Sequence, residues 1–171
     1  MYDRKSIISY LESYGWTENR HISTLDIPKL YSHFFDNFED DEELALDMFI
    51  SYTPFPKLME FWALYGNLDL KFSASSTNDN RGGVIAINEN AIVDCPDYSV
   101  VQTSIHYSVQ VFPVAVVEAY QCYITIDVNG HFRGLNYDGS VCDFSDDFLE
   151  VIDLFINHKP MPEWEYFSKH E

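Results

Sequence analysis

The stretch YITIDVNGHFRGLNY, residues 123–137, decides the fold because it places two strand patterns on either side of a turn signal. Residues 123–127 combine aromatic and β-branched side chains, a composition typical of strands. Asn129-Gly130 follows, and Asn-Gly is the preferred sequence of a two-residue hairpin turn. We therefore predict an antiparallel hairpin in which residues 123–127 pair with residues 131–137.

Other periodic patterns extend the prediction in both directions from this hairpin. Strands are predicted at residues 68–72, 84–87 and 112–117, and Asp138-Gly139 marks a further turn. Helical spacing of apolar residues predicts helices at residues 4–14, 25–38, 42–52, 57–65 and 146–157, the last with Ser145 as its N-cap. Residues 98–109 are predicted as a helix, although their Val, Thr and Ile content also suits a strand.

The order of these elements gives the fold class. The sequence predicts a single α+β domain over residues 1–171, with a central, mainly antiparallel sheet flanked by N-terminal helices and one C-terminal helix. Residues 73–83 are predicted as a loop, and residues 159–171 as a C-terminal tail in which Pro160-Met161-Pro162 is mobile.

Composition limits the compartment and the means of stabilisation. Hydrophobic residues make up 46% of the 171 residues, which suffices for a core without disulfides or metal. The three cysteines form no C-x-x-C pair, and an odd number cannot close a full disulfide set. The N-terminus lacks a signal-peptide pattern, and no apolar run approaches the roughly 20 residues that span a bilayer. We therefore expect a soluble, cytoplasmic protein without membrane contact.

The charge balance points to the class of partner. Twenty-eight acidic residues against 10 lysines and arginines leave a net charge of −18, which repels nucleic acid and anionic lipid and attracts basic proteins. An acidic surface that only maintains solubility accounts for the total charge equally well. The oligomeric state expected is a monomer or a weak homodimer.

Two acidic stretches make a partner-binding role more specific. Residues 30–56 and 134–158 each contain at least six carboxylates and no lysine or arginine. Carboxylates at a helix start also stabilise the helix dipole, but one or two suffice for that effect. The predicted partner-binding residues are Glu39, Asp40, Asp41, Glu42, Glu43, Asp138, Asp143, Asp146, Asp147 and Glu150. Trp16 and Trp164 are candidate aromatic anchors, and Trp16 is equally a core candidate.

Motifs for chemistry are weak throughout. The six histidines occur singly, without the spacing that sets two imidazoles on one helix face for zinc. Asp127-Val128-Asn129 begins like a calcium loop, but Phe132 stands where that loop needs glycine. The cysteines are predicted as buried apolar residues. We expect no catalytic residue, no metal site and no cofactor, and a hydrolase that uses paired carboxylates stays as an alternative.

Five short motifs, in order, resemble the SUKH-3 family, a branch of the SUKH superfamily of bacterial toxin-immunity proteins. They are GWTENRHI at residues 15–22, FWALYGNL at 61–68, FPVA at 112–115, IDVNGHF at 126–132 and the helix pattern at 148–156. The resemblance covers about residues 15–158. Asn67 and Ala115 stand where the family pattern has glycine, so the backbone is expected to differ there.

The resemblance implies an α+β domain that binds and neutralises a cognate toxin, often a nuclease, and that is not an enzyme. A basic nuclease is a partner that an acidic inhibitor would attract, so the charge agrees with this implication. An intracellular protein-binding adaptor of the same superfamily is the alternative that the resemblance leaves open.

Overall fold

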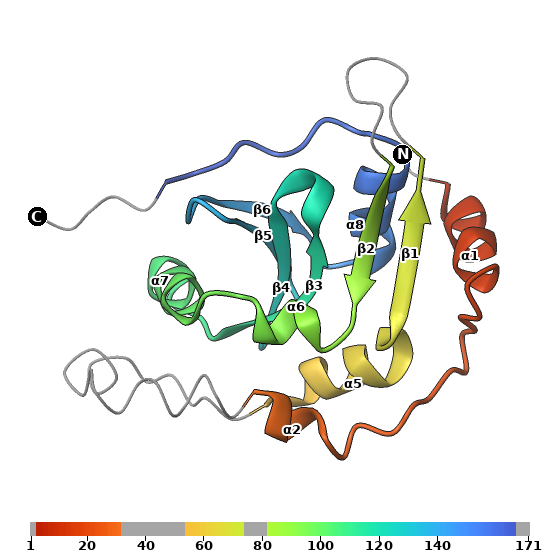
Figure 1. Cartoon of the computed structure of the whole chain (residues 1–171), viewed down its shortest axis with the longest axis horizontal. Coiled ribbons are helices and arrows are strands. Elements are labelled where there is room, and N and C mark those ends of the chain that lie inside the picture. The colour runs from red at the N-terminus through yellow and green to blue at the C-terminus, as the bar shows by residue number, and fades with distance from the viewer. Residues whose placement is uncertain (1–2, 32–53, 74–81, 167–171) are drawn as a thin grey trace, which may run out of the picture.

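The computed structural model describes residues 3–31, 54–73 and 82–166, and Figure 1 shows their arrangement. Within these residues, six strands form one antiparallel sheet in chain order. The strands are β1 (Leu68–Phe72), β2 (Gly83–Ile87), β3 (Val111–Val117), β4 (Cys122–Asp127), β5 (Phe132–Asn136) and β6 (Val141–Ser145). The predicted α+β class with an antiparallel sheet is confirmed.

The β4–β5 hairpin is confirmed, but its loop is one residue longer than the Asn-Gly pattern predicts. Asp127 N donates to His131 O at 3.0 Å, and Gly130 N donates to Asp127 O at 2.9 Å. Three residues, 128–130, therefore form the loop, and only its glycine has positive φ (+91°). The Asp127 carboxylate accepts from the amides of Asn129 and His131, at 2.8 and 3.0 Å, which stabilises this longer loop.

Six α-helices lie within the described residues. They are α1 (Arg4–Glu12), α2 (Ile27–Leu30), α5 (Pro56–Tyr65), α6 (Asn90–Val93), α7 (Asp97–Tyr107) and α8 (Phe148–Ile156), and a 3₁₀ turn, η2 (Glu118–Tyr120), joins β3 to β4. The helix predicted at residues 98–109 is confirmed as α7. Of the helix predicted at 25–38 only α2 is described, and the helix at 42–52 and most of the loop at 73–83 lie outside the described residues.

The predicted N-cap of the last helix is wrong by two residues. Asp147 caps α8, because its Oδ1 accepts from Leu149 N at 2.9 Å. Ser145 ends β6, and its hydroxyl accepts from Asp147 N at 3.1 Å. A short helix, α6, was not predicted, since one turn of four residues is too short to show helical periodicity.

Helices cover the two faces of the sheet unequally. On one face, α5 and α8 pack an aromatic cluster in which the rings of Phe61 and Phe132 both lie near Phe148, at 4.8 and 5.1 Å. The helix α1 packs against α8 beside β1, at the right in Figure 1. On the other face, α6 and α7 contact β3. All residues of β3 and β4 are buried, so the centre of the sheet is covered on both sides.

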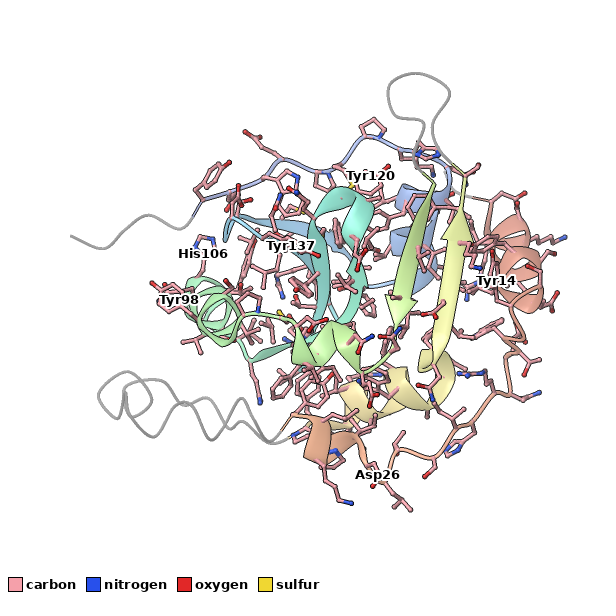
Figure 2. All side chains as sticks on the ribbon, in the orientation of Figure 1. Tyr14, Asp26, Tyr98, His106, Tyr120 and Tyr137 are labelled. Atoms are coloured by element: carbon pink, nitrogen blue, oxygen red, sulfur yellow. The ribbon has the colours of Figure 1, made fainter. Side chains whose placement is uncertain are left out.

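The tail that follows α8 is held against the sheet as far as it is described. Val141 and Glu165 exchange two backbone hydrogen bonds, at 2.8 and 2.7 Å, which covers the outer edge of β6. Figure 2 shows His106 on α7, and its ring lies 3.4 Å from the Glu165 carboxylate. The expected mobility of residues 160–162 therefore does not extend to the segment around Glu165.

No helix in the described ranges combines the length and the apolar character needed to cross a bilayer.

Candidate partner-binding surface

The first predicted acidic run, Glu39 to Glu43, lies outside the described residues. The second stretch is described in full, and it contributes four residues at one end of the sheet. We call Asp143, Asp146, Asp147 and Glu150 the β6–α8 patch, because they lie on β6, on the connection to α8 and on the first turn of α8. The patch therefore follows from the chain order of these two elements.

His131 connects two carboxylates of the β6–α8 patch. Its Nδ1 lies 2.6 Å from Asp146 Oδ1, and its Nε2 lies 3.2 Å from Asp143 Oδ1. An imidazole donates from both ring nitrogens only when both carry a proton. In that form His131 adds a positive charge to the patch. The Asp146 side chain is 87% exposed and remains accessible to a partner.

Arg133 lies deeper and joins the patch to the core. Its Nε donates to Asp143 Oδ1 at 2.9 Å, and its Nη1 donates to the buried Asp127 Oδ2 at 2.7 Å. The guanidinium Cζ lies 4.2 Å from the centre of the Tyr107 ring, a cation–π contact. Burial, together with the charge of Asp143, raises the pKa of Tyr107 to about 12, so this phenol is neutral at physiological pH.

The remaining two residues of the patch have structural contacts of their own. Asp147 caps α8 through Oδ1, and its Oδ2 accepts from Arg4 Nη1 of α1 at 2.8 Å. Glu150 accepts from the hydroxyl of Ser145 at 2.6 Å. Both carboxylates thus stabilise the start of α8 as well as adding negative charge.

Asp138 lies away from the other four predicted residues. It belongs to the β5–β6 turn, at the opposite end of these strands from His131 and Asp143. It accepts from Ser140 Oγ and Ser140 N, at 2.7 and 2.9 Å, and these hydrogen bonds hold the pKa of its carboxyl below the usual value. The carboxylates of the second stretch therefore do not form one continuous surface.

The β6–α8 patch is also less one-signed in space than in sequence. The stretch from residue 134 to 158 contains no lysine or arginine, yet the fold places Arg4, His131 and Arg133 against Asp147, Asp146 and Asp143. Lys159 likewise pairs with Asp153. The sequence alone could not reveal these pairs, because Arg4, His131 and Arg133 all lie outside the acidic stretch and reach it only through the fold.

A shallow recess lies beside the patch. It has a volume of about 290 Å³ and an aromatic floor that includes Phe61, Tyr65 and Phe148. Asp146 and Asp147 line it on one side, and the exposed pair of Lys57 and Glu60, 3.1 Å apart, lines it on the other. The recess has room for one side chain of a partner protein.

The residues of the first motif, GWTENRHI, serve the core. Trp16 is buried and stacks on Tyr65 with ring centres 6.0 Å apart, so it is not an exposed anchor. Arg20 donates to the carbonyls of Leu64 and Gly66, at 3.0 and 2.8 Å, and thereby caps the C-terminal end of α5. Trp164 is half-buried and lies close to Gly134 on β5.

The contacts of the described carboxylates do not favour the hydrolase alternative. That alternative predicts two acids of perturbed pKa in a deep pocket. The three carboxylates that line the recess, Glu60, Asp146 and Asp147, each pair with a basic side chain and not with one another. The ranges that the structure describes also contain no cluster of three or more His, Cys, Asp or Glu side chains suited to a metal ion.

Comparison with known proteins identifies a family. The model of a family described as SUKH-3 immunity protein matches residues 4–158, most of the chain. No curated protein and no solved structure matches the chain. The match begins at the start of α1, 11 residues before the first of the five motifs. It ends at His158, where the resemblance read from the sequence also ends.

Proposed function

The chain belongs to the SUKH-3 immunity protein family, and from this premise we propose that it neutralises a basic nuclease toxin by covering the toxin's cleft with an acidic surface. The family is one of immunity proteins and not of enzymes, which implies a toxin as the partner. The proposed mechanism is stoichiometric masking in the cytoplasm, with the immunity protein acting as a monomer or a weak homodimer.

The observation that carries the proposal is the charge of −18 in a chain of this family. A nuclease needs a positive cleft to hold phosphates, so a strongly acidic protein is attracted to that cleft and repelled by nucleic acid itself. Complementary charge of this kind accelerates association and makes it dependent on ionic strength.

The proposed contact surface includes the β6–α8 patch and the run from Glu39 to Glu43. Asp146 is the most exposed carboxylate among those of the patch that pair with a basic side chain, and the aromatic recess beside it would receive one side chain of the toxin. Aromatic pockets near the centre of an interface contribute most of the affinity, whereas rim charges mainly set the association rate. Asp138 would contribute only from the opposite end of β5 and β6.

Co-expression with the polymorphic toxin domain encoded beside its gene tests the proposal. Cells that express the toxin domain alone should die, and cells that also express this chain should survive. A catalytically inactive toxin domain should co-purify with the chain in a defined ratio. Survival without a complex would exclude masking. If the chain neither rescues the cells nor forms a complex, that result would favour the adaptor alternative.

A further inference from the structure

The second face of the sheet is open over β1 and β2, where Val84 and Ala86 of β2 are partly exposed. On β1, Leu68, Leu70 and Phe72 are buried, while Asp69 and Lys71 on the other face are exposed. In Figure 1, β2 is drawn in front of part of α8 and β1 lies beside it, and the buried side chains of both strands belong to the hydrophobic core. A groove of about 770 Å³ lies on the open side, and we call it the sheet groove. It is more than twice the volume of the recess beside Asp146.

The floor of the sheet groove is apolar and its rim is acidic or amide. Val84, Ala86 and Val116 from β2 and β3 form the floor. The rim carries the carboxylates of Asp69 and Glu118 and the amides of Asn88 and Gln121. Among the described residues that line the groove there is no lysine, arginine or histidine, and Lys71 lies on the same face of β1 without lining it.

The carboxylates of the sheet groove differ from those of the β6–α8 patch in their partners. Asp143, Asp146 and Asp147 each contact a basic side chain. In the part of the chain that the structure describes, neither Asp69 nor Glu118 forms an ion pair, and Asp69 accepts only from Asn88 Nδ2, at 2.9 Å. Within the described residues, therefore, these two carboxylates are not engaged in an ion pair and are available to a ligand.

Tyr137 lies beside the end of the groove that carries η2, whereas the ring of Tyr120 packs on Phe72 and Phe155 of the core. Tyr120 lines the groove, and Tyr137 is held close because its backbone N donates to Gln121 O at 3.0 Å. In Figure 2, Tyr120 is labelled beside α8 and Tyr137 toward β5 and β6. Burial, together with the charge of Glu118, raises the pKa of Tyr137, so this phenol is neutral at physiological pH. Tyr137 is 46% exposed and offers a ring face to a cation.

We propose that the sheet groove binds a lysine- or arginine-bearing segment of the toxin. A long basic side chain matches the groove because its methylene groups pack on the apolar floor while its charge reaches Asp69 or Glu118. The inference rests on the proposed function and adds a second contact surface. The groove lies toward the Val117 end of β3, whereas the β6–α8 patch lies toward the end at which Val111 pairs with Asp127.

Two substitutions in the groove test the inference in the full-length chain. Glu118→Lys reverses a rim charge, and Ala119→Trp fills the groove from an exposed position of η2. Glu12→Lys on α1 makes the same charge change on an exposed residue outside the groove and serves as the matched control. Binding of each variant to the inactive toxin domain is measured by calorimetry, and thermal unfolding shows that each variant is folded.

Both groove variants should raise Kd by at least about tenfold, while the control stays within about twofold of the wild type. Hydrogen exchange of the wild-type chain provides a readout free of substitutions, and the toxin domain should slow exchange in β2 and in residues 116–121.

Wild-type affinity in both groove variants, without protection of β2, would overturn the inference and leave the proposed function intact. Loss of self-association instead of toxin binding would make the groove a homodimer interface and overturn it too. A wild-type chain that does not bind the toxin domain would overturn the proposed function itself.

Discussion

Arg133 donates from Nη1 to Asp127 Oδ2 at 2.7 Å, and the Asp127 side chain is only 3% exposed. The other oxygen of Asp127 accepts the two amides of the β4–β5 loop. One buried carboxylate therefore joins a hairpin loop to an arginine that also contacts Asp143 and the ring of Tyr107. The motif IDVNGHF thus carries a structural ion pair next to the proposed binding surface.

Replacing Arg133 should destabilise the fold strongly. Arg133→Met leaves the Asp127 carboxylate buried without a cation, and the expected loss is about 3–5 kcal/mol of unfolding free energy. Chemical denaturation monitored by tryptophan fluorescence measures this loss. Arg4→Met is the matched control, because its pair with Asp147 is exposed and should contribute at most about 1 kcal/mol. Equal losses in the two variants would contradict a buried pair at Asp127.

Replacing Arg20 should lower stability without changing the interface. Arg20→Met removes both donors to the Leu64 and Gly66 carbonyls at the end of α5, with an expected loss of about 1–3 kcal/mol. Burial lowers the pKa of Arg20, so its charge is partly desolvated at this site. Thermal unfolding measures the stability, and toxin affinity at a temperature where the variant is folded should equal that of the wild type. A lower affinity of the folded variant would give Arg20 a binding role.

The stability of the fold should decrease at alkaline pH. Burial raises the pKa of the Cys142 thiol to about 12 and raises that of Cys122 further, while an unfolded cysteine titrates near about 8.5. Above the unfolded value, the unfolded chain loses protons that the folded chain keeps. The stability contribution is therefore complete below about pH 8.5 and is lost as pH rises toward the folded pKa.

Denaturation midpoints at about pH 7.5 and about pH 10.5 measure this dependence. Cys142→Ala should reduce the difference between the two midpoints, because it removes one of the titrating groups. Both thiols should also react slowly with a thiol reagent in the native state, since both side chains are buried. Rapid labelling of the native chain would show that these strands open readily and would contradict the expected burial.

The pairing of strands was predictable because it depends on local patterns. The alternating residues of β1 and the Asn-Gly signal after β4 identified a strand and a hairpin correctly. The loop length was not predictable, because it depends on the Asp127 side chain accepting loop amides. The helix α6 lacked a signal because it has a single turn.

The candidate surface was less predictable because it depends on contacts between distant residues. Arg4 and Asp147 are 143 positions apart, and no sequence pattern indicates that they meet. The sheet groove combines Asp69 with Glu118, which lie in two segments that are both weakly charged. Clusters of like charge along the chain therefore indicated two acidic stretches and missed the groove, to which β1 and η2 each contribute a single carboxylate.

Reversing the charge of Asp146 should slow toxin association while leaving the fold nearly unchanged. The Asp146 side chain is 87% exposed, so Asp146→Lys should change stability by at most about 1 kcal/mol through its contact with His131. At low salt, the association rate should fall several-fold, and the wild-type and variant rates should converge at high salt because exposed charges are screened. Stopped-flow mixing with the inactive toxin domain measures both rates.

Glu163→Lys, at an exposed position of the tail, makes the same change in net charge and separates local from long-range effects. Equal slowing by both variants would assign the effect to net charge alone, and unchanged rates in Asp146→Lys would exclude the β6–α8 patch from the interface.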